Sequence, residues 1–82
     1  MFVAKIKVKL KSSVLDPQGQ TVRKTLNEMG YDIIPDVRIG KYIEVQIDTK
    51  DRSEAEKIAS EVSQKILVNS VIESQEIEVL EK

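Results

Sequence analysis

The sequence predicts an α+β fold with the element order β-α-β-β-α-β, and three patterns carry that prediction. Residues near the N-terminus alternate between apolar and charged side chains, as a half-buried strand does. Two later stretches repeat apolar residues at helical spacing. A central stretch, Val37 to Ile47, alternates on both sides of Gly40-Lys41, as a hairpin does. We therefore expect a single domain over residues 1–82 with a ferredoxin-like, two-layer architecture: one antiparallel sheet with two helices on one face.

The first strand is predicted from Phe2 to Lys11. Its two faces differ completely: one carries Phe2, Ala4, Ile6, Val8 and Leu10, and the other carries Lys5, Lys7, Lys9 and Lys11. The lysine row fits either an anionic ligand or a charged, solvated sheet face. In a ferredoxin-like sheet the first and last strands are antiparallel neighbours. The lysines at 5, 7 and 9 would then face Glu76 and Glu78, which accounts for the row without a ligand.

The first helix is predicted to begin at Asp16-Pro17. Asp16 is a good N-cap and Pro17 fits the first helical position, because its missing N–H needs no partner there. Gly30 suits the position that follows the helix. Gly19 is unusual in a first turn, and it indicates either the close approach of another backbone or a tolerated glycine. The apolar stripe of this helix consists of Val22, Leu26 and Met29.

The second strand is predicted from Tyr31 to Ile39, at a sheet edge because Pro35 cannot donate to a ladder. Gly40-Lys41 would form a type II′ turn, whose first residue needs a positive φ. The third strand would follow from Tyr42 to Asp48. An unfilled edge of the sheet could also pair with a second copy of the chain.

The second helix is predicted from a capping box, with Ser53 as N-cap and Glu56 reaching back to it. Its apolar stripe consists of Ala55, Ile58, Ala59, Val62 and Ile66. Asn69-Ser70 breaks the helical pattern, Val71-Ile72-Glu73 begins an extended segment, and Gln75 to Leu80 alternates as the last strand.

Composition narrows the functions that the chain could have. The 82 residues include no cysteine and no histidine, which removes disulfides, thiol chemistry and the commonest general base and metal ligand. Glycines stand singly, so no phosphate-binding loop is present, and no carboxylates are spaced for acid–base catalysis. We therefore expect neither catalytic residues nor a metal site.

Charge and hydropathy exclude two further classes of partner. Thirteen basic and fourteen acidic residues give a net charge of −1, whereas nucleic-acid binders carry a positive excess. Tyr31 and Tyr42 are too few to form a base-stacking platform. No apolar run is long enough to span a membrane, and no signal peptide is visible. A cytoplasmic location is the expectation, with neither nucleic acid nor membrane as a partner.

Four short motifs, in order and spread over the whole chain, resemble the PurS family. They are Leu15-Asp16-Pro17-Gln18-Gly19, Gly30-Tyr31, Val37-Arg38-Ile39-Gly40-Lys41, and Asn69 with Val71-Ile72-Glu73. PurS is the small subunit of the bacterial and archaeal phosphoribosylformylglycinamidine (FGAM) synthase complex of purine biosynthesis. The sequence departs from the family pattern at Ser70, where proline is usual.

The resemblance implies a non-catalytic assembly subunit of a glutamine- and ATP-dependent ligase complex. Such a subunit forms a dimer or tetramer, bridges a PurL-type synthetase and a PurQ-type glutaminase, and supports ammonia transfer between them. ATP and Mg²⁺ would belong to the synthetase, and this chain would bind no cofactor. The motifs also imply interface candidates, namely Asp16, Gln18, Gly19, Arg38, Gly40, Lys41, Asn69 and Glu73.

Two other classes of function remain open, and the first shares the predicted element order. One is a regulatory module of the ACT type, which binds amino acids between subunits and would melt at a higher temperature with its effector bound. The other is an RNA-binding sheet, against which the charge and the two tyrosines argue.

Overall fold

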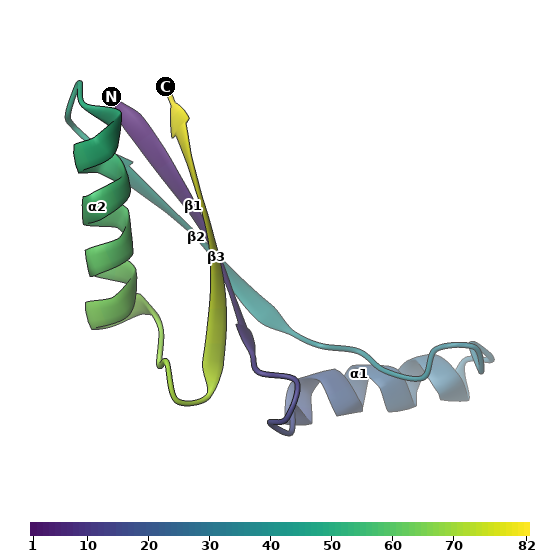
Figure 1. Cartoon of the computed structure of the whole chain (residues 1–82). Coiled ribbons are helices and arrows are strands. Elements are labelled where there is room, and N and C mark those ends of the chain that lie inside the picture. The colour runs from purple at the N-terminus through teal and green to yellow at the C-terminus, as the bar shows by residue number, and fades with distance from the viewer.

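The computed structural model describes the backbone of residues 1–82 and all side chains except those of Ile66 and Leu67. Three strands and two α-helices make an α+β fold, which confirms the predicted class (Figure 1). A short π-helix, Ser63–Leu67, extends the second α-helix. The elements in chain order are β1 (Phe2–Leu10), α1 (Pro17–Glu28), β2 (Gly40–Ile47), α2 (Arg52–Val62) and β3 (Glu73–Glu81).

The sheet has the order β2-β1-β3, and both neighbours of β1 are antiparallel to it. The first and last strands are therefore adjacent, as predicted. On the outer face, Lys5 lies between Glu44 and Glu78, and Lys7 lies opposite Glu76. Opposite charges across strands stabilise a sheet by roughly 0.2–1 kcal/mol per pair. The lysine at position 9 differs from the prediction, because its neighbours on the two sides are Gly40 and Ser74.

The core lies between the inner face of the sheet and α2. The apolar residues of β1 are buried there, and Ala55 and Ala59 of α2 are fully buried against them. Two alanines one turn apart let the helix approach the strand closely, since they carry no side chain beyond Cβ. The inner-face residues of β1 are Phe2, Ala4, Ile6 and Val8.

The helix α2 begins two residues earlier than a capping box at Ser53 requires. Its N-cap is Asp51, whose Oδ1 accepts a hydrogen bond from the Ser53 backbone N–H at 2.9 Å. Glu56 forms an ion pair with Arg52 at 3.8 Å instead of reaching back to the cap. Ala55 and Ala59 are buried and Ile58 and Val62 half-buried, as the stripe predicts, whereas the Ile66 side chain lies outside the described residues.

The predicted strand from Tyr31 to Ile39 does not form in the described backbone, and neither does the hairpin. Gly40 is the first residue of β2 and lies opposite Lys9 in the ladder, without the positive φ of a type II′ turn. The segment before it forms hydrogen bonds with side chains near α1 instead of with a neighbouring strand. Residues 32 and 33 form a turn, so the strand that alternation predicted over this segment is wrong.

The helix α1 points away from the sheet, so α2 alone covers the inner face (Figure 1). Residues 29–39 return along α1 toward the sheet, and we call α1 with these residues the arm (Figure 1). The arm makes the molecule elongated, with extents of 51 × 26 × 14 Å. It also leaves the α1 stripe largely uncovered, with Met29 67% exposed. Of the two helices predicted to pack on one face of the sheet, only α2 therefore does so in this chain.

Candidate functional site

The eight interface candidates gather at one end of the sheet. Because β2 and β3 are both antiparallel to β1, the end of β1 lies beside the starts of the other two strands, and α1 begins just after β1. A hollow of about 250 Å³ opens there between α1 and the sheet. Five of the eight candidates line it, namely Asp16, Gln18, Gly40, Lys41 and Glu73. The other three contact the lining residues or stand next to them in the chain.

Asp16 joins the two ends of the arm. It is the N-cap of α1, and its Oδ1 accepts a hydrogen bond from the Gly19 N–H at 2.9 Å. Its Oδ2 accepts another from the N–H of Ile39, 23 residues later, at 2.7 Å. The carboxyl is buried, and these bonds, from Ile39 first and then Gly19, lower its pKa, with a further contribution from the charge of Arg38. Asp16 is therefore ionised at neutral pH and serves as a fixed acceptor.

Gly19 lies where the returning segment touches α1. A Cβ at this position would stand 2.0 Å from the carbonyl oxygen of Val37. Of the two interpretations of this glycine, the close approach of another backbone is the correct one. Only glycine lets the returning segment come near enough for Asp16 to reach the Ile39 N–H.

Arg38 ties the returning segment to the connection between β1 and α1. Its Nη2 donates to the carbonyl oxygens of Lys11 at 2.9 Å and Val14 at 2.7 Å. The planar guanidinium is suited to such paired contacts, which the point charge of a lysine would not reproduce. Together Asp16, Gly19 and Arg38 hold α1 and the returning segment together at the base of the arm.

Gly40 is required by the ladder, not by a turn. A Cβ at this position would lie 2.5 Å from the carbonyl oxygen of Val8 on the neighbouring strand. The absence of a side chain lets β2 start close against β1, beside the hollow. The turn geometry predicted for this glycine was therefore wrong.

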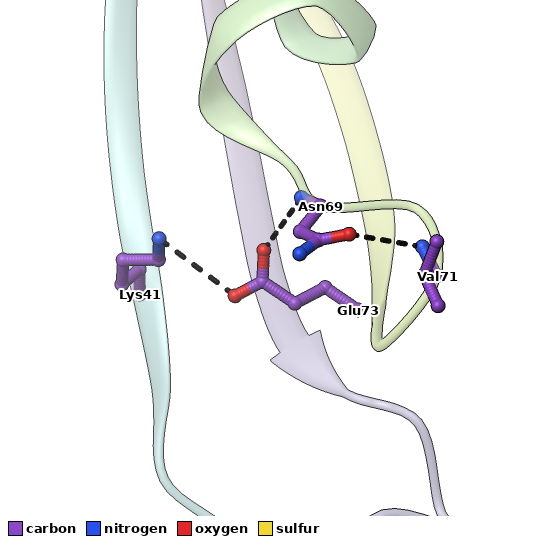
Figure 2. A network of polar contacts seen from close by, with 4 residues as sticks. All are labelled: Lys41, Asn69, Val71 and Glu73. Atoms are coloured by element: carbon purple, nitrogen blue, oxygen red, sulfur yellow. Dashed lines mark hydrogen bonds and ion pairs between the residues drawn. The ribbon is translucent and has the colours of Figure 1, made fainter.

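Lys41, Asn69 and Glu73 form a second network at the same end (Figure 2). The Glu73 carboxylate accepts a hydrogen bond from the Asn69 N–H at 2.7 Å and lies 3.7 Å from the ammonium of Lys41. The Asn69 side chain accepts from the Val71 N–H at 3.2 Å and so shapes the turn before β3. Lys41 is well exposed, so its ion pair contributes at most about 1 kcal/mol, and the turn depends mainly on the hydrogen bonds.

Ser70 occupies the second position of that turn. The Ile72 N–H donates to the Asn69 carbonyl oxygen at 3.1 Å, which places Ser70 and Val71 at the two central positions. Proline is favoured at the first central position of such turns, but serine is also compatible with it. The departure from the family pattern therefore leaves the turn intact.

Among the described side chains, no group of three or more carboxylates stands close enough to hold a metal ion. Tyr42, on the outer face of the sheet, donates its hydroxyl to Glu44 at 2.9 Å. Burial and this carboxylate raise the tyrosine pKa, which keeps the phenol protonated near neutrality. The arrangement can fix a shape and present charge, and its exposed polar residues are Gln18, Arg38, Lys41 and Asn69.

Two residues with structural roles were missed by sequence reasoning. Arg52 stacks on the Phe2 ring at 5.5 Å and donates to the Val79 carbonyl oxygen at 2.8 Å, joining α2 to two strands. Asn27 closes the far end of the arm by donating to the Tyr31 and Ile34 carbonyl oxygens at 2.8 and 3.3 Å. Neither contact has a local sequence signal, except that Asn27 precedes the helix-ending Gly30.

The described part of the chain contains no helix with the length and apolarity that crossing a membrane requires.

The chain is similar to known proteins over nearly its full length. Residues 3–81 match the family model for PurS, phosphoribosylformylglycinamidine (FGAM) synthase. The FGAM synthase subunit PurS of Bacillus subtilis is 46% identical over 81 residues, which cover 99% of this chain and 95% of that protein. The crystal structure of Methanocaldococcus jannaschii PurS, 30% identical, superposes with a TM-score of 0.88 and covers 100% of this chain and 99% of that one.

A structure of PurLQS from Thermotoga maritima also contains a similar chain. It is 30% identical, its TM-score is 0.86, and the match covers 96% of both chains. Sequence and structure thus agree from the first strand to the last, and the resemblance seen in the four motifs is confirmed. The chain belongs to the PurS family of FGAM synthase subunits.

Proposed function

We propose that this chain is the small assembly subunit of an FGAM synthase complex, without catalytic residues or a cofactor of its own. It would bridge a PurL-type synthetase and a PurQ-type glutaminase and support the transfer of ammonia between them, in the cytoplasm. The observation that carries the proposal is the likeness to the PurLQS structure from Thermotoga maritima along 96% of both chains. ATP and Mg²⁺ would be bound by the synthetase.

The contacts of the motif residues support a structural role over a chemical one. The side chains of Asp16, Arg38 and Glu73 all form hydrogen bonds with main-chain groups of this same chain. A catalytic group needs to point at a substrate, whereas these groups fasten the arm and the start of β3. As interface residues they would act by holding the surrounding surface in shape. Gln18 and Lys41 are exposed beside the hollow and are the better candidates for direct contact with a partner subunit.

Uncovered apolar surface supports self-association into a dimer or a tetramer. The α1 stripe faces solvent, with Val22 39% and Met29 67% exposed. On the inner face of the sheet, Ile43 and Val45 of β2 are only half-buried, beside the single helix that covers it. Burying a side chain of this size contributes about 1.5–3 kcal/mol, so a second copy that covers both surfaces would add substantially to a small core.

Co-elution with the two partner subunits tests the proposal. The chain would be mixed with the synthetase and the glutaminase of the same organism and analysed by size-exclusion chromatography with light scattering. We expect an oligomer of the isolated chain and a larger particle that contains all three proteins. A particle of synthetase and glutaminase that forms equally well without this chain would contradict the bridging role.

A further inference from the structure

The lysine row on the outer face of the sheet is unbalanced at one end. Lys9 differs from the lysines before it, which lie opposite carboxylates, because its neighbours in the ladder are Gly40 and Ser74 and neither carries charge. Lys11 follows at the end of β1 and is exposed. Pairing across the described strands therefore accounts for the start of the row but not for Lys9.

A hollow of about 560 Å³ opens on the outer face at this end of the sheet. Most of its lining is apolar, and its edge is mainly basic: the ring of Tyr42 and the charged residues Lys7, Lys9, Arg38, Lys41 and Glu76 line it. A neighbouring hollow of about 520 Å³ shares Lys9 and Arg38 with it and adds Lys11. We call the two together the basic hollow. Apolar surface edged by positive charge is complementary to an apolar group edged by negative charge.

The tip of the arm, residues 28–36, is such a group. Ile33 is 91% exposed, the highest value among the described large apolar residues, and Tyr31 is 51% exposed two positions before it. Residues 28–36 include Glu28, Asp32 and Asp36 and no basic residue. All three acidic side chains are exposed. The tip and the basic hollow are therefore complementary in both hydropathy and charge.

The tip is a built turn, not a loose end. Gly30 takes the left-handed conformation, with φ of +103°, and the Tyr31 N–H donates to the Leu26 carbonyl oxygen at 3.0 Å. The Asn27 side chain then bridges the Tyr31 and Ile34 carbonyl oxygens. A rigid turn that displays apolar side chains is pre-organised for binding, since little conformational entropy remains to be lost.

The tip and the basic hollow lie at opposite ends of the arm, so one molecule cannot join them (Figure 1). The 12 residues of α1 separate the two ends by about 18 Å. The junction at Asp16 and Arg38 fixes the direction of the arm. Two copies can join them, because arms laid side by side in opposite directions place each tip beside the base of the other. Both contacts then form at once around a two-fold axis, with the uncovered α1 stripe between them.

We propose that the tip of each copy binds with Ile33 in the basic hollow of a second copy, and with its carboxylates against Lys9 and Lys11. The occupant is a second copy because one chain carries both complementary surfaces. Their places at the two ends of the arm also let a pair of copies form two identical contacts. This inference rests on the self-association in the proposed function and identifies the contact that orients it.

The test reverses charges on each side separately, two at a time because a single exposed charge contributes little. The tip variant is Glu28→Lys with Asp36→Lys, and the hollow variant is Lys9→Glu with Lys11→Glu. Like charges then oppose each other in each variant alone, and we expect its dissociation constant for self-association to rise by about tenfold or more. In a mixture of the two variants both contacts join opposite charges, so the mixture is expected to associate about as tightly as the unaltered chain. Sedimentation velocity over a dilution series measures these constants.

The matched control is Lys50→Glu with Lys57→Glu, which reverses two exposed lysines away from the basic hollow. It changes the net charge by the same amount as the hollow variant does. We expect it to self-associate like the unaltered chain, and to associate with the tip variant more weakly than the hollow variant does. The circular dichroism spectrum of every variant is expected to match that of the unaltered chain, because all the altered side chains are exposed.

Each other outcome overturns the inference. Unchanged self-association of the tip and hollow variants would leave the α1 stripe to hold the copies together. Weakened variants whose mixture is not restored would show that the tip and the basic hollow do not meet each other. Loss of binding to the synthetase or the glutaminase, with self-association unchanged, would assign the tip to that subunit. An unaltered chain that is monomeric at every concentration would overturn the self-association in the proposed function itself.

Discussion

At the scale of single residues, the direction of the arm depends on a few polar groups. The Asp16 carboxylate holds backbone N–H groups that are 20 positions apart, at Gly19 and Ile39. The Arg38 guanidinium donates to two carbonyl oxygens of the connection between β1 and α1, at the same junction. Hydrogen bonds to charged groups are among the stronger ones, and these connect segments that have no ladder in common. Surface charges such as Lys41 contribute less, because solvent screens them.

Asp16 predicts a specific pH dependence of stability. Its native pKa lies below the value of about 3.9 that an unfolded aspartate has, because the Ile39 and Gly19 N–H groups favour the charged form. Its contribution to stability is therefore complete above about pH 4 and is lost as the pH falls through the native pKa. Asp16→Asn is expected to be less stable than the unaltered chain at pH 7, with a difference that shrinks toward pH 3.

Urea unfolding at several pH values measures this difference. The control is Asp32→Asn, which removes an exposed carboxyl at the arm tip and is expected to follow the unaltered chain throughout. A gap between Asp16→Asn and the unaltered chain that stays constant from pH 7 to pH 3 would show that ionisation of this carboxyl does not hold the junction.

At the scale of elements, local signals in the sequence were enough for most of the fold. Alternation located β1 and β3, and Asp16-Pro17 with Gly30 located α1 to within a residue or two. The segment 31–39 shows where this reasoning stops. Its alternation fits any extended chain, and whether a ladder forms is decided by a neighbour that sequence periodicity does not name. In this chain the neighbour is α1, through Gly19 and Asp16.

The candidate site was predicted as a set of residues but not as a geometry. All eight candidate positions come from the four motifs, through the resemblance to the family. Their pairing is non-local, as between Asp16 and Ile39 or between Lys41 and Glu73, and no spacing rule links such distant positions. Gly40 shows the same limit: a glycine suited to a turn was equally suited to a close strand contact.

The contact between α1 and the returning segment predicts an unusual response at Gly19. Replacing glycine by alanine inside a helix normally stabilises it by up to about 1 kcal/mol. Here the new methyl would stand 2.0 Å from a backbone oxygen, so we expect Gly19→Ala to destabilise the chain by about 1–3 kcal/mol, as overpacking does. The control is Gln20→Ala, on the exposed side of the same turn. A urea midpoint for Gly19→Ala at or above that of the unaltered chain would contradict the packing described.

At the scale of the whole molecule, the chain consists of a small body and a projecting arm. The body buries one compact core between α2 and the sheet, and the arm adds length without adding a core of its own. An isolated helix of 12 residues is marginal in water, so the arm depends on its junction and on the surfaces that it meets. This shape suits a subunit that connects other proteins.

Glutamine-dependent turnover by the reconstituted complex tests the central claim most directly. The synthetase and the glutaminase would be assayed for glutamine-dependent ATP hydrolysis with and without this chain, and the synthetase also with ammonia supplied in place of glutamine. We predict that glutamine-dependent turnover requires all three proteins, that ammonia-dependent turnover by the synthetase does not require this chain, and that the chain alone is inactive. Full glutamine-dependent turnover without this chain would contradict its role as the bridging subunit.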